Sequence, residues 1–161
     1  MFLFLFLPLP FFVHVVGALL NVTIDDTDSM IRYSGTWESS SSHLSGLDYG
    51  GSHTVSSDTS GSATFTFTGV AVYYLAPRWP YAVNTQLTLD GGSSIIVNLT
   101  DPKASTTAAG GSESAGFSVA WSATGLTNTS HTLVASMAST GQFIIVDGFM
   151  CILPLPFLLP S

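Results

Sequence analysis

The sequence predicts an all-β fold, an antiparallel β-sandwich of the jelly-roll type. Short runs of alternating apolar and polar residues recur along the chain, with Gly, Ser and Asn between them. No segment keeps the 3.6-residue apolar period of a helix. Short strands at fairly even spacing with turn residues between them are typical of sandwiches and jelly rolls. The length of 161 residues allows one domain with a core and is too short for two ordinary domains.

The clearest predicted strand covers 63–68, where Ala63, Phe65 and Phe67 alternate with three threonines. Gly69 ends this run, and a more buried strand is expected directly after it at 70–75. Further strands are expected at 31–37, 53–55, 86–90, 95–99, 117–121, 132–137 and 143–149. The sandwich is expected to be closed, so that its first and last strands meet.

Turn and loop residues separate these strands. The run Asp90-Gly91-Gly92-Ser93 predicts a hairpin turn, because glycine accepts positive φ. A loop is expected at 76–81, because its two prolines cannot sit in a central strand. The Ser-rich stretch 39–62 is expected to be a long functional or mobile loop, or alternatively a carrier of O-glycans. A second loop is expected at 101–114.

Residues 1–18 are predicted to be a secretory signal, because an almost wholly apolar stretch ends in small residues that suit cleavage after Ala18. The stretch contains no Lys or Arg, so a signal anchor is the alternative. Pro8 and Pro10 count against an anchor, because a spanning helix needs about 20 uninterrupted apolar residues. The β-sandwich domain is therefore expected at 21–149, in the extracellular space or at the cell surface, with no stable membrane span after cleavage.

Residues 150–161 are expected to be an apolar, proline-interrupted tail outside the domain. The tail is too short to span a membrane. A lipid-anchor signal would need small residues and a polar spacer before the apolar end. Placing the small residues at 139–141 would remove the last strand, so an anchor is disfavoured and the tail has no assigned role.

Three Asn-x-Ser/Thr acceptors for N-glycosylation support export. They begin at Asn21, Asn98 and Asn128, and none has proline in the middle position. The second and third stand near predicted turns, where an acceptor is accessible.

Charge and cysteine content exclude some classes of protein. The formal net charge is -7, and charged residues make up 8% of the chain. The fixed cations are only Arg32, Arg78 and Lys103, so the clustered basic residues that nucleic-acid binding requires are absent from the sequence. A single cysteine, Cys151, excludes an internal disulfide.

Known catalytic motifs are missing, which predicts a protein that is not an enzyme. The sequence holds no Gly-x-Ser-x-Gly elbow, no His-Glu-x-x-His pair and no phosphate-binding glycine loop. His43 and His53 are expected to be polar histidines of the Ser-rich loop, because adjacency in sequence does not make a catalytic triad. His131 is expected at the start of a strand.

An acidic cluster near the start offers oxygen ligands of the kind that calcium prefers. It contains Asp25, Asp26 and Asp28. Neighbouring carboxylates repel each other, and a bound cation would relieve that repulsion. The alternative is a solvated acidic turn. The cluster is not an EF-hand loop, which would require a central glycine and a final glutamate.

Aromatic residues in loops are candidates for sugar binding, because sugar-binding modules stack exposed rings on pyranose faces. Trp79 and Tyr81 lie in the proline-rigidified segment, and Arg78 beside them can donate to sugar hydroxyls. Tyr49, in the Gly-rich part of the long loop, is a second candidate. The alternative is that Trp79 only anchors its loop to the edge of the sandwich. The remaining large aromatic residues are expected in the core: Trp37, Phe65, Phe67, Trp121 and Phe149.

The order of several motifs resembles a group of fungal extracellular domains. These motifs are DDTD…IRYSGTW, ATFTFTGVAVY, LTLDG, GLTNTSHTL and IIVDGF, and they cover roughly 25–149. The resemblance implies a galactose-binding-domain-like jelly roll, related in architecture to carbohydrate-binding modules. It also implies that Asp147 on the last strand lies beside the acidic cluster, where related modules hold a structural calcium.

Two functional hypotheses follow from these features. The first is a secreted, non-catalytic carbohydrate-binding or cell-wall-associated module, whose partner is a glycan or a cell-wall polysaccharide. The second is a structural ectodomain of a cell-surface sensor or adhesion protein without affinity for sugar. Exposure of Trp79 and Tyr81 separates them, because burial of both rings would remove the only site that the first hypothesis names. No feature of the sequence indicates the oligomeric state.

Overall fold

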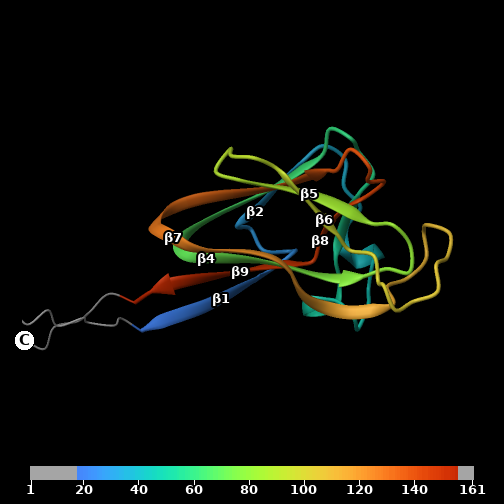
Figure 1. The fold of residues 1–161 in the computed structure, drawn as a ribbon, viewed down its shortest axis with the longest axis horizontal. Helices are drawn as coiled ribbons and strands as arrows, with labels where there is room; N and C mark the ends of the chain where they lie inside the picture. Colours follow the sequence, from blue (N-terminus) through green and yellow to red (C-terminus); the bar gives the residue numbers. More distant parts are fainter. Residues whose placement is uncertain (1–17, 156–161) are drawn as a thin grey trace, which may run out of the picture.

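Two long strands, β4 (Ser62–Arg78) and β7 (Ala115–Met137), frame the computed structural model, which describes residues 18–155. They pair antiparallel along most of their length. The register shifts between Gly69 and Ala71, and residues 125–128 of β7 opposite this point have no partner on β4. Both strands fold over there, so each contributes one arm to each layer of a sandwich (Figure 1).

The remaining strands extend these arms on either side. One layer continues through β5 (Asn84–Leu89) to β6 (Ile95–Asn98), with β2 (Ile31–Ser34) on the other side of β4. The other layer continues from β4 through β9 (Gly148–Pro154) to β1 (Leu19–Asp25). All of these pairs are antiparallel. The structure therefore confirms the predicted all-β, antiparallel β-sandwich.

A short second sheet stands at one end of the sandwich. It pairs β3 (Thr54–Ser56) with β8 (Ile144–Val146). Two single turns of 3₁₀ helix precede β3, η1 (Ser40–Ser42) and η2 (Tyr49–Gly51). The long Ser-rich segment is therefore structured around these turns and one strand. In the part of the chain from 18 to 155, no helix is long and apolar enough to cross a membrane.

The first and last described strands meet, as the sequence predicted, but further along the chain than expected. β1 pairs with β9 from Leu19↔Pro154 to Asp25↔Gly148. The expected boundary at 149 falls inside β9, because residues 150–154 pair with β1 on one side and reach β4 on the other. Cys151 is 2% exposed in this strand, which explains why the segment is apolar. The predicted signal lies outside the described residues except for Ala18, as do residues 156–161 of the expected tail.

The segment 76–81 is only partly the expected loop, because β4 continues through Pro77 to Arg78. The register of β4 against β7 shifts between Ala76 and Arg78, and proline is tolerated at such an irregularity because no ladder hydrogen bond is required of it there. Gly69 likewise bends β4 instead of ending it. The expected strands at 117–121 and 132–137 are two arms of the single strand β7.

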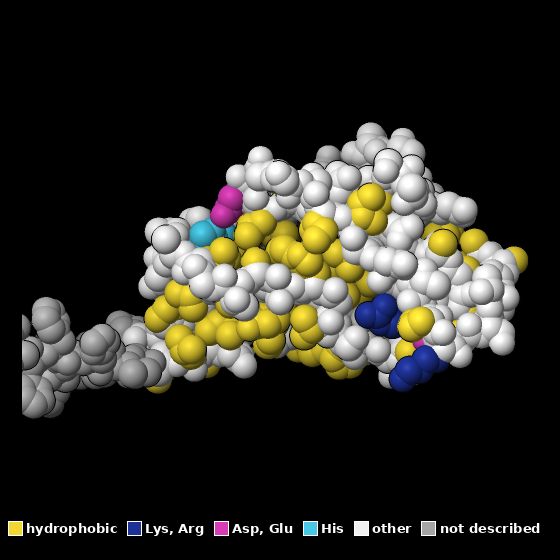
Figure 2. Space-filling view, in the orientation of Figure 1, with side chains coloured by type: hydrophobic (Ala, Val, Ile, Leu, Met, Phe, Trp, Pro, Cys, Tyr) yellow, Lys and Arg dark blue, Asp and Glu magenta, His cyan; other side chains and the backbone are white. Residues whose placement is uncertain are grey.

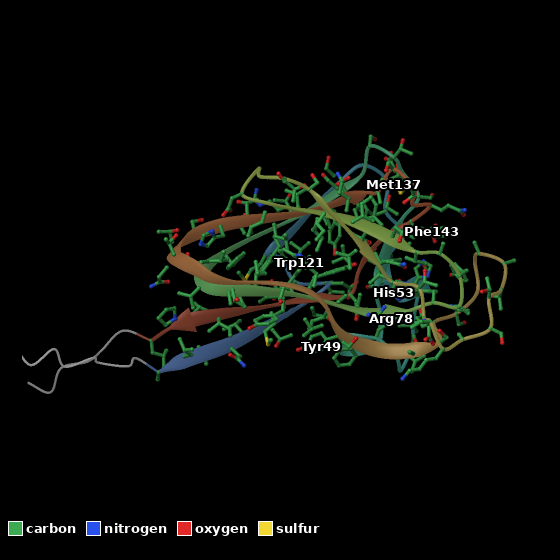
Figure 3. The ribbon with its side chains drawn as sticks, viewed as in Figure 1. Tyr49, His53, Arg78, Trp121, Met137 and Phe143 are labelled. Carbon is green, nitrogen blue, oxygen red and sulfur yellow. The ribbon has the colours of Figure 1, made fainter. Side chains whose placement is uncertain are left out.

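The core lies between the layers and is built on stacked aromatic rings. The ring of Phe65 stacks on Phe67 at 5.3 Å and on Phe149 at 4.9 Å. Tyr74 is fully buried beside them. Thr66 and Thr68 face outward from the same strand, as the alternation predicted. Hydrophobic side chains also gather along one long side of the sandwich (Figure 2), where the partly buried Trp121 lies between the layers (Figure 3).

Candidate functional site

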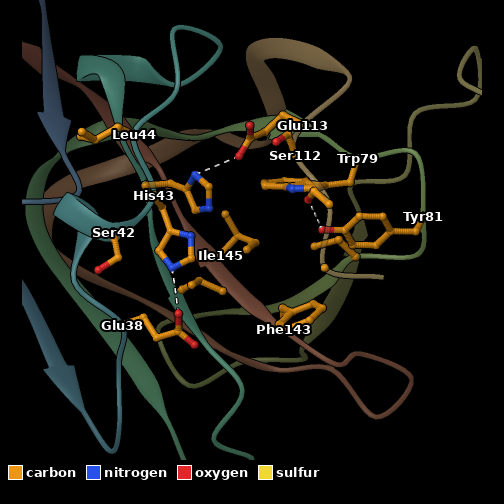
Figure 4. A pocket seen from close by; sticks show the side chains of 15 residues that line it. Glu38, Ser42, His43, Leu44, Trp79, Tyr81, Ser112, Glu113, Phe143 and Ile145 are labelled. Atoms are coloured by element: carbon orange, nitrogen blue, oxygen red, sulfur yellow. Dashed lines mark hydrogen bonds and ion pairs between the residues drawn. The ribbon is translucent and has the colours of Figure 1, made fainter. Parts of the chain in front are cut away.

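A cavity of about 460 Å³ lies at the end of the sandwich away from the ends of the described chain. Its walls come from four regions: the long segment before β4, the segment around Trp79 after β4, the loop that precedes β7, and the segment of Phe143 and Ile145 at β8. Histidines and acidic residues form one side, and aromatic rings form the other (Figure 4). The Ser-rich stretch and the second loop that the sequence predicted therefore both line the cavity.

The aromatic side consists of Trp79, Tyr81 and Phe143. Backbone bonds hold Trp79 in place, since its N–H donates to Leu99 at 3.0 Å. The hydroxyl of Tyr81 donates to the carbonyl of Gly111 at 2.7 Å. The rings line the cavity, but Trp79 is only 3% and Tyr81 only 6% exposed. The expected exposed stacking platform is therefore not formed, because the loop before β7 folds against these rings.

The polar side is built on two histidines, each held by acidic side chains. His43 Nε2 lies 2.9 Å from a carboxylate oxygen of Glu38. His53 Nδ1 lies 2.9 Å from Asp48 and 3.3 Å from Glu113. The His53 ring lies 5.1 Å from the His43 ring and packs edge-on against Trp79 at 5.5 Å. Both histidines line the cavity instead of serving as isolated loop residues.

A second cluster of polar groups is sealed behind this wall. It contains Asp25, Asp26, Asp48 and Asp147, which together have five carboxylate oxygens that are buried and without a hydrogen-bond partner in the described structure. Asp26 and Asp147 are fully buried. Burial raises the pKa of Asp147 to about 8, and the other three carboxylates raise it further. Burial likewise raises the pKa of Asp26 to about 6, against the hydrogen bond that Thr54 donates to it.

The ends of the closing strands position this acidic cluster. Asp25 is the last residue of β1, and Asp147 stands between β8 and β9. The backbone N–H of Asp26 donates to the carbonyl of Asp147 at 3.1 Å. Gly50 approaches the carboxylate of Asp25 so closely that a Cβ there would collide with Oδ1, and its φ is 70°. Glycine at this position therefore leaves the room that the carboxylate occupies.

The structure brings three of the four predicted metal ligands together and leaves the fourth apart. Asp25, Asp26 and Asp147 all contribute unpartnered oxygens to the cluster. Asp28 instead stabilises the turn before β2, where its Oδ1 accepts a hydrogen bond from the N–H of Met30 at 2.8 Å. Asp48 takes part in the cluster and was missed, because nothing in the sequence connects a single aspartate of the Ser-rich segment with the ends of β1 and β8.

The carboxylates of the cluster fit a hard divalent cation such as calcium. Calcium takes six to eight oxygen ligands, and aspartate carboxylates are common among them. Unpaired buried carboxylates are costly unless a cation or a proton neutralises them. The five unpartnered oxygens and the raised pKa values both indicate that neighbouring side chains do not compensate these carboxylates, so that a proton or a bound cation must neutralise them.

Two of the predicted sugar-binding residues lie outside the cavity. One Nη of Arg78 lies 3.4 Å and 3.3 Å from the carbonyls of Asn98 and Thr100, so its guanidinium ties the end of β4 to the end of β6. Tyr49 packs edge-on against Phe117 with ring centres 5.5 Å apart. Neither residue lines the cavity, and Phe143, Glu38 and Glu113 are lining residues that sequence reasoning missed.

The three glycosylation acceptors are all exposed. Asn21 lies on β1, Asn98 ends β6, and Asn128 stands in the part of β7 that has no partner on β4. The side chain of Asn98 accepts a hydrogen bond from the N–H of Thr100 at 2.8 Å, which forms a local turn. All three side chains are sterically available for modification.

No protein-family model matches the sequence, and a search of curated proteins also finds no match. Solved structures do match the fold. A CBM35 module from Cellvibrio japonicus Abf62 superposes with a TM-score of 0.55 at 13% identity, covering 83% of this chain and 93% of that chain. The fold is similar to that of a CBM35 module.

Larger proteins contain a similar unit. An exo-β-1,3-galactanase from Phanerochaete chrysosporium, solved with galactose, matches with a TM-score of 0.54 at 12% identity over 81% of this chain. A family two carbohydrate esterase from Cellvibrio japonicus matches with a TM-score of 0.52 at 11% identity over 88% of this chain. This chain spans 29% of the galactanase and 37% of the esterase. At these identities the likeness establishes the β-sandwich fold.

Proposed function

We propose that this chain is a secreted, non-catalytic carbohydrate-binding module, of the kind found in the fungal extracellular domains it resembles. Its ligand is a glycan or a cell-wall polysaccharide. The cavity beside Trp79 is the observation that supports this proposal. Its volume of about 460 Å³ falls in the range of small-ligand pockets and suits the end of a glycan chain. The likeness in fold to a CBM35 module is a further, associational support.

The lining of the cavity suits a sugar ring. A pyranose has apolar C–H faces and polar hydroxyl edges, so it needs an apolar wall opposite hydrogen-bonding groups. Phe143 is only partly buried and offers an apolar surface, while Glu38 and His43 offer acceptors and donors across the cavity. Glu38 is the more accessible of the two acidic residues that line the cavity, with 61% of its side chain exposed against 7% for Glu113.

The experiment is binding of the secreted protein to a glycan panel and to insoluble cell-wall polysaccharides. Phe143→Ala and Glu38→Gln remove a lining ring and a lining carboxylate, while Tyr49→Ala removes an aromatic ring outside the cavity. We expect saturable binding that the two cavity variants weaken at least several-fold and that Tyr49→Ala retains. Binding that is lost only in Tyr49→Ala would place the site outside the cavity and contradict the proposal.

The second candidate function is a structural ectodomain of a surface sensor or adhesion protein. The burial of Trp79 and Tyr81, at 3% and 6% exposure, favours it, because these rings are then anchors of their loops. A folded protein that binds no member of the panel would support this function, and the search would move to protein partners.

We further propose that the acidic cluster holds a structural calcium ion bound by Asp25, Asp26, Asp48 and Asp147. The bound ion would supply the positive charge that the buried carboxylates lack. A ligand that binds only the native state must raise stability. We therefore expect the thermal midpoint to rise with calcium and to fall after its removal, and identical midpoints would contradict the proposal.

A further inference from the structure

Two carboxylates converge on one nitrogen of His53. The Nδ1 atom lies 2.9 Å from Oδ2 of Asp48 and 3.3 Å from Oε1 of Glu113. The three side chains are 5%, 0% and 7% exposed, so water contributes little to their charge balance. Their three candidate ligand atoms lie within 4.8 Å of one another. This group joins the segment before β3 to the loop before β7.

A proton does not fully satisfy this arrangement. An imidazole nitrogen carries at most one hydrogen, so Nδ1 cannot donate a full hydrogen bond to both carboxylates at once. Even with His53 protonated, the trio would hold two negative charges against one positive charge. Oδ1 of Asp48 is in addition sealed and without a partner among the described residues. The negative charge of the two carboxylates is therefore not fully compensated at the point where the three ligand atoms converge.

The separations suit a metal ion instead. Zinc binds nitrogen and carboxylate oxygen at about 2.0–2.2 Å, so ligand atoms on one ion lie roughly 3–3.5 Å apart. The distances of 2.9 and 3.3 Å from Nδ1 match that spacing. We propose that Asp48, His53 and Glu113 bind a divalent metal ion of the zinc class, which takes the place of the proton on Nδ1.

This site differs from the acidic cluster in its chemistry. The cluster offers oxygen atoms alone, whereas this trio includes an imidazole nitrogen, a ligand that zinc accepts and calcium does not favour. Asp48 joins the two sites, since its Oδ2 faces His53 while its Oδ1 is one of the unpartnered oxygens of the cluster. The proposal does not depend on sugar binding.

The cavity supplies a route of entry. His53 and Glu113 line the cavity, while Asp48 lies behind them. An ion can therefore reach the trio from solvent without opening the core. Three protein ligands leave a fourth position for a water molecule or for an oxygen of a bound molecule, as in zinc sites that are not closed by the protein.

The test is a calorimetric titration of the full chain with Zn²⁺, after metal removal and in saturating Ca²⁺, which keeps the acidic cluster filled. We expect one Zn²⁺ per chain. Glu113→Gln keeps the size of the side chain and should lower zinc affinity by about tenfold or more, as loss of a ligand or its orienting partner does. Glu38→Gln is the matched control, because it alters the other histidine–glutamate pair of the same cavity and should leave zinc affinity unchanged.

Spectroscopy identifies the ligands independently. Cu²⁺ bound in the same site should show electron paramagnetic resonance coupling to one imidazole nitrogen, and Glu113→Gln should alter the spectrum. Absence of zinc binding by the folded wild-type protein would overturn the proposal, as would equal affinity in wild type and Glu113→Gln. Coupling to two imidazole nitrogens, or loss of zinc binding in Glu38→Gln, would place the ion on His43 and overturn the assignment as well. Circular dichroism confirms that each variant is folded before it is titrated.

Discussion

The backbone of Asp26 is hydrogen-bonded to the backbone of Asp147, with 3.1 Å between the donor nitrogen and the acceptor oxygen. This bond continues the pairing of β1 with β9 by one residue and brings two fully buried carboxylates into one cluster. Folding therefore gathers negative charge at the place where the sandwich closes. The stability of the closed sandwich must then depend on what neutralises that charge.

Without metal, the protein should lose stability as pH rises. Burial raises the pKa of Asp147 to about 8 and that of Asp26 to about 6, from an ordinary 3.8. Between pH 4 and 8 the folded chain thus binds more protons than the unfolded chain, so the free energy of unfolding falls with pH. Urea unfolding of the metal-free protein at pH 5 and pH 8 should differ by on the order of a few kcal/mol. Asp147→Asn should flatten this dependence, whereas Asp28→Asn, in the exposed turn, should not. A metal-free wild type that is equally stable at both pH values would contradict the buried cluster.

Gly50→Ala and Gly51→Ala should separate backbone strain from cation binding. Both glycines have positive φ, 70° and 93°, so alanine strains the backbone at either position. Only at Gly50 does the added Cβ collide with the carboxylate of Asp25, and nothing lies within 4 Å at Gly51. We expect both variants to melt earlier without calcium, Gly50→Ala by the larger amount because of the collision, and Gly50→Ala to gain less from calcium. An equal calcium-dependent rise in the thermal midpoint of both variants would place the cation away from Asp25.

Tyr74→Phe should destabilise the protein more than Tyr73→Phe. The hydroxyl of the fully buried Tyr74 donates to the carbonyl of Ile145 at 2.7 Å and so ties β4 to β8. Its loss leaves a buried carbonyl without its partner, at a cost of about 1–3 kcal/mol. The neighbouring Tyr73 is only half-buried and points to the other face of the strand. Chemical denaturation of both variants measures the difference, and equal free energies of unfolding would argue against the hydrogen bond.

His131 should stabilise the fold mainly in its protonated form. Its Nδ1 lies 2.7 Å from a carboxylate oxygen of Asp90 and its Nε2 lies 2.8 Å from the carbonyl of Thr127. Both partners are acceptors, so only the imidazolium can donate to both. The hydrogen bonds to Thr127 and Asp90 raise the pKa of His131 above 6.5.

The contribution of this imidazolium should be complete below pH 6.5 and disappear as pH rises through the raised pKa. His131→Gln should therefore destabilise the protein more at pH 5.5 than at pH 8.5. His43→Gln, a partly exposed histidine of the cavity wall, serves as the control. The nuclear magnetic resonance titration of His131 checks the cause directly, since an ordinary or lowered pKa would remove the explanation.

The strands were predictable where one face of the strand is buried and the other face is exposed to solvent. The alternation around Phe65 indicated β4 clearly, because period-two patterns report a sheet with two different faces. The continuation past Pro77 and the residues 150–154 of β9 were not predictable in the same way. Pro77 is tolerated because the register of β4 is irregular there. Residues 150–154 are apolar and only partly buried, and they resemble a tail in the sequence because their strand partners lie far away along the chain.

The candidate sites were also predictable only in part, because they depend on contacts between residues that lie far apart in the sequence. Asp25, Asp26 and Asp147 were expected together because of a family resemblance, and alternation alone would not have joined them. Asp48 and Glu113 were not predicted, because their contact with His53 depends on two loops that meet only in the folded chain. Trp79 was predicted as a site residue because it is aromatic. Its burial depends on how the loop before β7 packs against it, and the residue type alone does not predict that packing.

The pairing of Leu19 with Pro154 has a mechanical consequence. Because β1 and β9 are antiparallel, the two ends of the described chain leave the sandwich side by side (Figure 1). A force that pulls these ends apart loads the ladder bonds one after another, like a zipper, instead of shearing all of them at once. Peeling would start at Leu19 and reach Asp25 last. A cation held by Asp25, Asp26 and Asp147 would then resist further separation of β1 from β9 once peeling reaches the last pair of the ladder.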